Sequence, residues 1–319
     1  MQAQVIEDRW GIVYVPKPGV RRSHRRWEHI LSYLEERDVK YDSVLSDGVR
    51  SVNRLFKMLI LNGYRTLVVV GGDAALNEAV NAIMSFDDEV KSQVVLGVIP
   101  NGFGNNFASF WGLDEDDYKA SVDHLIRKRI RKVDVGICYY HSGLGEEESE
   151  QYRYFINAVN IGLGASIIGI TEKAERLVGV KFFARIVSSI RLIFERISYK
   201  VSAEINYERF EGNVTGLCVG SCLGYGQTPN AVPYNGMVDV SIVQLPNDVR
   251  QIFLGLYLLV SGKFLNYHKV LPFRSREVTI ERADHARISV DGRFLKTGKV
   301  PLRIKVLQEH LNFVIPSRG

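Results

Sequence analysis

Two short segments in the first half of the chain combine glycine with acidic and amide side chains directly after apolar runs. Gly71-Gly72-Asp73 follows TLVVV, and the segment from Pro100 to Asn106 (PNGFGNN) follows VVLGVI. Glycine at the carboxyl end of a strand lets the backbone approach a ligand, and amides at the start of the next helix favour an anion. Together the two loops predict a phosphate site, whereas structural turns alone would explain a single glycine pair. Neither loop has the Walker sequence or the spacing of the dinucleotide fingerprint.

The residues around these loops predict alternating strands and helices. Apolar runs of strand length lie at 10–15, 39–45, 66–70 and 94–100, and helical periodicity occurs at 23–38, 51–63, 74–84 and 114–129. Strands that alternate with helices indicate a parallel sheet covered on both faces. Ligands of such sheets bind beyond the carboxyl ends of the strands, which is where both glycine loops fall.

From Val133 onward the pattern changes to segments in which apolar and polar residues alternate. Two helical stretches, at about 165–197 and 247–264, interrupt them. We therefore expect an α/β domain with a parallel sheet over 1–132 and a mainly antiparallel β domain over 133–319. The last strands, from about 305 to 319, could also return to pack on the first domain. The glycine cluster at 162–166 (GLGAS) is better read as a close-packed turn than as a ligand loop.

Composition limits the class of protein. The 319 residues carry a net charge of +5, with dense basic runs at 21–27 (RRSHRRW) and 127–132 (RKRIRK). Both runs fit phosphate, an anionic membrane or nucleic acid, and both also fit solvated helix faces. The longest apolar run, 252–260, is too short to span a bilayer, and the first ten residues lack the apolar core of a signal peptide. Three cysteines (Cys138, Cys218 and Cys222) fit core thiols better than a metal site or a disulfide framework. We expect the protein to work in the cytoplasm.

The two loops and later segments of the chain resemble motifs of the diacylglycerol kinase catalytic family. This family includes bacterial lipid kinases and sphingosine kinases, and it shares its nucleotide domain with NAD kinases. That family carries Gly-Gly-Asp-Gly-Thr before Leu-Asn-Glu, and a second loop Pro-x-Gly-Thr-Gly-Asn-Asp-Phe-Ala. The matching residues here are Gly71, Gly72, Asp73, Leu76, Asn77, Glu78, Pro100, Gly102, Gly104, Asn105, Phe107 and Ala108. Further on, 224–243 resembles the family's Pro-x-Ala and Asp-Gly-x-Leu-Asp-Val segment, and 289–295 (SVDGRFL) resembles its Val-Asp-Gly-Glu.

The resemblance implies a two-domain, ATP- and Mg²⁺-dependent kinase that phosphorylates a lipid hydroxyl at the surface of an anionic membrane. A homodimer is compatible with the sequence. The nucleotide would bind Gly71, Gly72, Asp73, Asn77, Glu78, Pro100, Gly102, Gly104 and Asn105. Asp291 would be the general base, and Asp239 and Asp134 fall where the family keeps acids for magnesium or for structure. From the local sequence alone, Asp291-Gly292 is equally well a hairpin turn.

Several positions depart from the family pattern. Alanines replace Gly-Thr after Asp73, and the other departures are Val15, Phe103, Asn106, Asn235 and Arg293. A second hypothesis is therefore a catalytically impaired lipid- or nucleotide-binding regulatory protein. Nucleic-acid binding is disfavoured because the basic runs lack interleaved aromatic residues and no known module is present. NAD kinase is disfavoured because the later segments match the lipid branch. Nothing in the sequence names the lipid.

Overall fold

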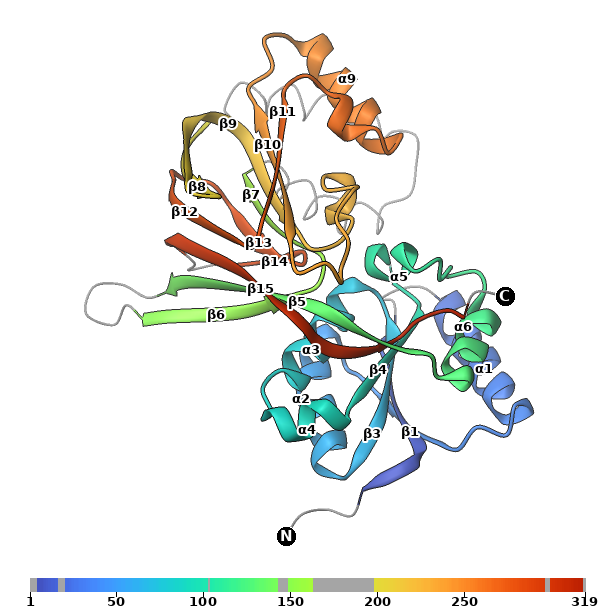
Figure 1. The fold of residues 1–319 in the computed structure, drawn as a ribbon. Helices are drawn as coiled ribbons and strands as arrows, with labels where there is room; N and C mark the ends of the chain where they lie inside the picture. Colours follow the sequence, from blue (N-terminus) through green and yellow to red (C-terminus); the bar gives the residue numbers. More distant parts are fainter. Residues whose placement is uncertain are drawn as a thin grey trace. The chain divides into compact units, whose positions relative to one another are not determined.

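The computed structural model describes residues 5–16, 21–102, 104–142, 149–162, 198–295 and 299–317. The chain divides into two compact units (Figure 1), unit 1 with Met1–Asp134 and Gln308–Gly319, and unit 2 with Val135–Leu307. The unit boundaries fall within two long strands, β5 (Ile130–Ser142) and β15 (Lys299–Val314). Phe103, residues 163–166 of the GLGAS segment and the helix expected at 165–197 lie outside the described residues.

Unit 1 is built on a parallel sheet. Its strands are ordered β4-β3-β1-β2, and the end of β15 pairs in parallel with β4, with Asn312 opposite Val95. The strands are β1 (Ile6–Tyr14), β2 (Tyr41–Leu45), β3 (Tyr64–Gly71) and β4 (Val95–Pro100). All of β4 and the last six residues of β3 are buried, as continuous apolar runs in a covered parallel sheet should be.

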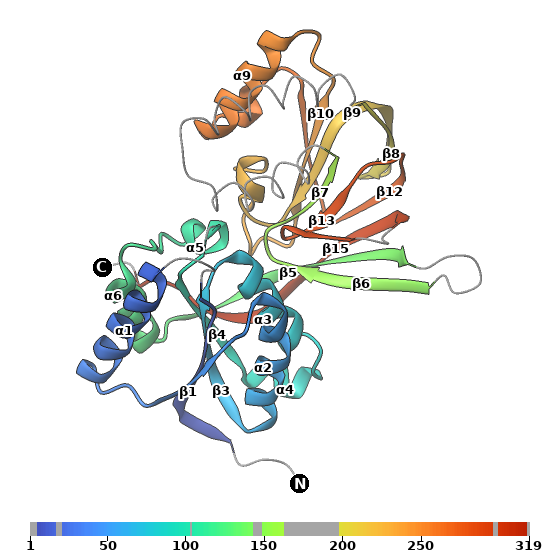
Figure 2. The same cartoon turned by 180° about the vertical axis from the view of Figure 1, so that it is seen from behind.

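In the described part of unit 1, six helices accompany this sheet. They are α1 (Arg21–Glu36), α2 (Val49–Leu61), α3 (Asp73–Ile83), α4 (Asp88–Gln93), α5 (Asn106–Phe110) and α6 (Tyr118–Arg127). Figures 1 and 2 show α1 and α6 on one face of the sheet and α2, α3 and α4 on the other. Asp87 and Asp117 begin α4 and α6 by accepting hydrogen bonds from the amides of Val90 and Ala120. Acidic residues at these positions are therefore helix caps.

Unit 2 is a mainly antiparallel β structure, so the predicted fold class is confirmed for both halves of the chain. One path of paired strands runs β14-β13-β7-β9-β8-β12-β15, while β10 pairs with β9 and β11, and β5 pairs with β6. The strands not yet given are β6 (Ser149–Phe155), β7 (Ala158–Gly162), β8 (Tyr199–Ile205), β9 (Glu208–Gly220), β10 (Val238–Gln244), β11 (Val270–Ser275), β12 (Glu277–Ala283), β13 (Ile288–Val290) and β14 (Arg293–Phe294). Among the residues described in unit 2, the helical elements are α9 (Val249–Val260) and the short 3-10 turns η2 (Gly224–Gly226) and η3 (Phe264–Asn266).

The core of unit 2 follows the alternation of its strands. Val159 and Ile161 of β7 face the apolar core, whereas the residue between them, Asn160, is buried with polar neighbours. Cys138, Cys218 and Cys222 are all buried, as expected of core thiols. Burial raises the pKa of Cys138 to about 12, so this thiol stays protonated and unreactive at neutral pH.

Candidate functional site

The two glycine loops of unit 1 leave the carboxyl ends of neighbouring parallel strands. Gly71, the last residue of β3, pairs in register with Pro100, the last residue of β4. Beyond the sheet the pairing continues, because the amide of Asn101 donates to the carbonyl of Gly71 at 3.0 Å. In addition, the amide of Asp73 donates to the carbonyl of Gly104 at 2.8 Å. The structure therefore brings both predicted loops together as one hydrogen-bonded surface.

The Asp73 carboxylate fixes this surface from within. It is 5% exposed, and its Oδ2 accepts from both the amide and the side-chain Nδ2 of Asn106, at 2.8 and 2.9 Å. Its Oδ1 accepts from the amide of Phe107 at 3.1 Å. Asp73 thus caps the start of α5 from the other loop. An aspartate in place of Asn106 would put a second carboxylate against Asp73, so the departure at Asn106 suits this contact.

Glycines 72 and 102 are required by the packing of one loop against the other. A Cβ on Gly72 would lie 2.7 Å from both the Cα of Gly102 and the carbonyl oxygen of Gly104. A Cβ on Gly102 would in turn collide with the backbone of Gly72. At Gly104 the nearest atom to an added Cβ is Asp73 Oδ2 at 3.5 Å, an ordinary contact. A side chain at residue 72 would therefore displace the second loop before it met any ligand, whereas Gly104 has room for a methyl group.

The alanines that replace the family's Gly-Thr lie in the first turn of α3. Ala74 and Ala75 are both helical, so Ala74 does not carry the strain of a left-handed conformation. The amides of Ala75 and Leu76 both donate to the carbonyl of Gly72 at 3.0 Å. The Leu76 bond is the ordinary first bond of the helix, whereas the amides of Asp73 and Ala75, in the first turn, are directed at loop carbonyls. This arrangement reduces the number of α3 amides that point outward to an anion.

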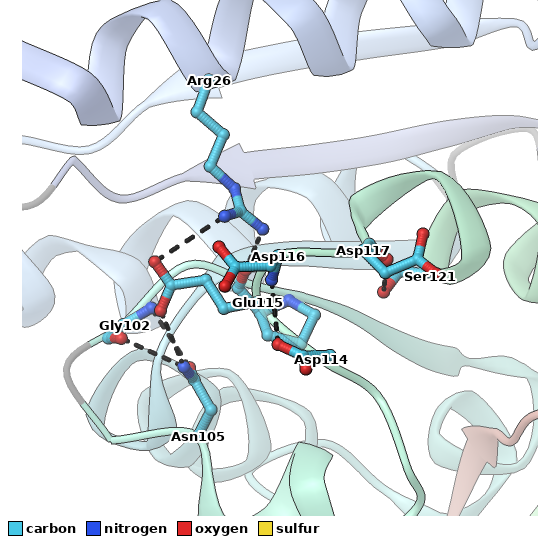
Figure 3. Close-up of polar contacts among 9 residues, drawn as sticks. Arg26, Gly102, Asn105, Asp114, Glu115, Asp116, Asp117 and Ser121 are labelled. Carbon is cyan, nitrogen blue, oxygen red and sulfur yellow. Dashed lines mark hydrogen bonds and ion pairs between the residues drawn. The ribbon is translucent and has the colours of Figure 1, made fainter.

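Figure 3 shows a second network, which ties α1 to the Pro100–Asn106 loop. Asn105 Oδ1 accepts from the Gly102 amide at 3.1 Å, and its Nδ2 donates to the Gly102 carbonyl at 3.0 Å and to Glu115 Oε2 at 3.2 Å. Arg26 Nη2 donates to the Pro100 carbonyl at 3.0 Å, and its Nη1 lies 3.7 Å from Glu115 Oε1. Arg26 belongs to the first basic run, so part of that run holds the loop. Sequence reasoning missed both Arg26 and Glu115.

The other two α3 residues predicted to bind nucleotide are buried. Asn77 and Glu78 are 1% and 5% exposed. Asn81 Nδ2 donates to the Asn77 carbonyl at 2.8 Å, and Asn53 Nδ2 donates to the Glu78 carbonyl at 3.3 Å. Both residues therefore lie on the packed side of α3, and it is their backbone carbonyls that accept these two bonds.

Asp291 of unit 2 forms a tight hairpin and is also held by its carboxylate. Asp291 and Gly292 join β13 to β14 with positive φ angles of 45° and 80°, as a two-residue turn of type I′ requires. Asp291 Oδ1 accepts from the amides of Asn157 and Ala158 at 2.9 and 2.8 Å, and Oδ2 accepts from the amide of Ile156 at 2.8 Å. Three amide donors stabilise the ionised carboxylate and fix its orientation.

Next to this carboxylate lie buried polar atoms that the sequence reasoning did not single out. Asn157 is fully buried, and among the residues that the structure describes neither its Oδ1 nor its Nδ2 has a hydrogen-bond partner. The same holds for Asn160 Nδ2 and Ser289 Oγ, which stand opposite each other on β7 and β13. Buried polar groups without partners are costly, and they are often found where a ligand or an ordered water binds.

The two acids predicted for magnesium have protein partners instead. Arg274 Nε donates to Asp239 Oδ1 at 2.6 Å and its Nη2 to Oδ2 at 3.1 Å, so one guanidinium occupies both carboxylate oxygens. This hydrogen bond raises the pKa of Arg274. Asp134 is fully buried, accepts from the Glu309 amide at 2.9 Å and belongs to unit 1, whereas Asp239 belongs to unit 2. Over the described ranges, no three His, Cys, Asp or Glu side chains gather as a site built from protein side chains alone would need. These donor sets do not fit a protein-held magnesium ion.

Comparison with known proteins gives the same relatives for both halves of the chain. Residues 9–138 match the diacylglycerol kinase catalytic domain, and residues 157–315 match the YegS C-terminal NAD kinase beta sandwich-like domain. A diacylglycerol kinase of Staphylococcus carnosus is 25% identical over 314 residues, which cover 96% of this chain and 94% of that protein. A diacylglycerol kinase of Bacillus subtilis is 22% identical over 311 residues, with 96% of each chain covered.

Solved structures agree on the fold. A diacylglycerol kinase structure from Bacillus anthracis superposes with a TM-score of 0.66 at 15% identity, covering 97% of each chain. Yeast NADH kinase superposes with a TM-score of 0.54 at 11% identity, covering 97% of this chain and 84% of that one. In the part of the chain that the structure describes, we find no helix with both the length and the apolar character needed to cross a membrane.

Proposed function

Because the chain belongs to the diacylglycerol kinase catalytic-domain family of lipid kinases, we propose that it transfers the terminal phosphoryl group of ATP to a hydroxyl of a diacylglycerol- or sphingoid-type lipid. The observation that carries this proposal is the paired loop surface of unit 1. Two glycine loops follow adjacent strand ends, as in nucleotide sites of parallel sheets, and Asp73 bonds them into one unit.

The nucleotide phosphates would lie against the second loop, where the backbone is most accessible. Gly104 is the loop glycine with space around its Cα, and the Arg26 and Asn105 network holds its neighbours in place. Magnesium, which offsets charge on the transferring phosphoryl group, would enter with the nucleotide, since phosphate oxygens and waters are its usual ligands. Asp239 and Asp134 would then keep the structural roles that their contacts indicate.

In unit 2, Asp291 is the proposed proton acceptor for the lipid hydroxyl. Its three amide contacts orient the carboxylate but also stabilise its ionised form, which weakens it as a base. Asn157, whose backbone amide donates to Asp291, also has a buried side chain whose donor and acceptor have no partner among the described residues and could bind an alcohol group. We propose that Asp291 accepts the proton and that Asn157 orients the hydroxyl.

A second function remains supported by specific observations. The α3 amides directed at loop carbonyls and the amide-held Asp291 also suit a lipid- or nucleotide-binding regulator without turnover. In such a protein the loops would still bind nucleotide, but no phosphoryl group would reach a lipid.

One experiment separates these functions. The purified full chain would be incubated with Mg²⁺, labelled ATP and mixed micelles of diacylglycerol, sphingosine or ceramide, and nucleotide binding would be measured by calorimetry on the same protein. A labelled lipid phosphate in one reaction, absent with Asn157→Leu, supports the kinase. Nucleotide binding without labelled lipid supports the regulator. If the protein neither binds any nucleoside triphosphate nor labels any lipid, the kinase proposal is wrong.

A further inference from the structure

Helix α9 of unit 2 presents an apolar face that the rest of the described protein leaves exposed. Phe253 and Leu254 are 46% and 43% exposed, Tyr257 is 67% exposed, and Val260 is 88% exposed. Leu254, Tyr257 and Val260 follow Phe253 by one, four and seven residues, and this spacing places all four side chains on the same side of the helix. Figures 1 and 2 show α9 at the periphery of unit 2.

The opposite face of α9 accounts for how the helix is attached. Ile252 is 7% exposed, and a Cβ on Gly255 would lie 3.0 Å from the ring of Tyr267. Leu258 and Leu259 pack on the small cluster formed by Phe264, Tyr267 and Val270. Because the attachment uses this face alone, the exposed apolar residues are not needed to hold α9 in place.

The charged residues within α9 and in the segment that follows it are all basic. From residue 249 to residue 276 the chain contains no Asp or Glu. Arg250, in the first turn, and Lys263, just after the helix, are both exposed. The preceding acid, Asp248, is used to begin the helix and accepts from the Gln251 amide at 2.9 Å. An apolar face bordered by cations is complementary to a surface that is apolar below and anionic above.

We propose that α9 docks on an anionic lipid surface. Phe253, Leu254, Tyr257 and Val260 enter the boundary between headgroups and acyl chains, while Arg250 and Lys263 contact anionic headgroups. A helix of 12 residues is about 18 Å long, so it lies in the plane of the membrane and does not span it. The assignment rests on the proposed function, because a lipid substrate in a bilayer gives such a surface its purpose. It places the membrane contact on α9 and not on the two basic runs.

The test compares two variants of the full chain in vesicle sedimentation. Tyr257→Ser/Val260→Ser removes the two most exposed apolar residues of α9, and Tyr207→Ser, whose side chain is 98% exposed on another part of unit 2, is the matched control. With vesicles of phosphatidylcholine and phosphatidylglycerol, we expect the double variant to bind about tenfold more weakly and the control to bind like the wild type. Lys263→Glu should weaken binding as well, and phosphatidylcholine alone should bind poorly. Equal melting temperatures of the wild type and all of its variants would show that the fold is unchanged.

The other outcomes are decisive too. Equal vesicle binding by the wild type and the double variant would overturn the proposal. A wild-type protein that does not bind anionic vesicles would overturn it as well. A wild-type dimer that the double variant converts to a monomer, without any change in vesicle binding, would assign the face to a second copy of the chain. Kinase activity on a detergent-dispersed lipid is measured separately. If the protein is active and the double variant binds vesicles as the wild type does, only the docking proposal is rejected. If the double variant binds vesicles more weakly but the wild type has no kinase activity, only the kinase proposal is rejected.

Discussion

Asp291 and Ala158 are joined in both directions. The Asp291 carboxylate accepts from the Ala158 amide at 2.8 Å, and the Asp291 amide donates to the Ala158 carbonyl at 2.9 Å. The first contact belongs to a side chain and the second to the β13–β7 pairing, so one residue both ends a strand and clamps the neighbouring strand. Any substitution at this position therefore changes stability, whether or not Asp291 is also the proposed base.

Asp291→Asn tests both effects at once. The side-chain amide can accept through one oxygen only, so at least one of the three backbone donors loses its partner. We expect the free energy of unfolding to fall by about 1–3 kcal/mol in chemical denaturation. If Asp291 is also the base, turnover in the lipid kinase assay should fall by about a hundred- to ten-thousand-fold, with a smaller effect on nucleotide affinity. Asp284→Asn, at an acid of unit 2 that is half-buried and paired with Arg282 at the surface, should change neither by a comparable amount. A destabilised variant with near-normal turnover would leave Asp291 as a turn former only.

Gly104→Ala and Gly72→Ala separate ligand approach from loop packing. The added methyl group has room at residue 104 but meets the opposite loop at 2.7 Å at residue 72. We expect Gly72→Ala to lower the melting temperature clearly and Gly104→Ala to leave it nearly unchanged. If phosphate approaches the second loop closely, Gly104→Ala should still weaken ATP binding by about tenfold or more in calorimetry, because the methyl group occupies that space. Unchanged ATP affinity in Gly104→Ala would place the phosphates elsewhere.

The sequence was sufficient for the strand-to-loop geometry but not for the contacts that complete it. Glycines directly after two apolar runs predicted adjacent loops, because parallel strands end at the same edge. The role of Asp73 as a cap for α5 depends on residues 33 and 34 positions away, which only the register of β3 and β4 brings near. Arg26 reaches Pro100 from 74 positions away, so a local basic pattern could not distinguish it from a solvated arginine.

Asp239 illustrates the same limit in unit 2. A segment that resembles the family's acidic motif suggested a metal ligand, yet β10 and β11 place Arg274 directly opposite Asp239. The two residues are 35 positions apart, and their pairing follows from strand register. A guanidinium can satisfy a carboxylate as fully as a metal ion does, and local sequence does not reveal which of the two is present.

Arg274→Met should therefore destabilise unit 2 without making it dependent on metal. The variant leaves the Asp239 side chain, which is 12% exposed, without its counter-charge. Because Arg274 itself is half exposed, we expect a loss of about 1–2 kcal/mol in unfolding free energy, less than for a fully buried pair. Wild-type stability should be the same in EDTA and in Mg²⁺, and Arg282→Met, which breaks an exposed Arg–Asp pair, should be neutral. A wild-type melting temperature that falls in EDTA would restore the metal assignment.

His124 on α6 gives a pH dependence whose sign can be worked out. Burial, with a smaller contribution from Arg127, lowers the pKa of His124 from its ordinary value of 6.5. As the pH falls below about 6.5, the unfolded chain takes up this proton before the folded protein does, so stability decreases until the folded pKa is reached. His124→Gln should remove that decrease, and His29→Gln, at an exposed position of α1, should retain it. Melting temperatures between pH 5 and pH 8 measure the difference. If the melting temperatures of His124→Gln and the wild type changed with pH in the same way, His124 would not be the source of the pH dependence.

Ala74→Gly restores one family residue and distinguishes the two functions. Ala74 is helical, so glycine relieves no strain there and should cost about 0.5–1 kcal/mol in unfolding free energy. Any gain in ATP affinity must come from backbone freedom at the start of α3, which would let the amides of its first turn rotate from the Gly72 carbonyl toward phosphate. If the protein is a catalytically impaired family member, Ala74→Gly should raise ATP affinity. Combining it with Ala75→Thr and Arg293→Glu should then raise lipid phosphorylation or leave it at zero. In an enzyme adapted to its own donor or lipid, the same changes should lower activity, because the alanines and Arg293 then belong to its working site. Calorimetry and the labelled-lipid assay on the single and triple variants decide between them, with Ala82→Gly, buried in the last turn of the same helix, as the control for stability loss alone.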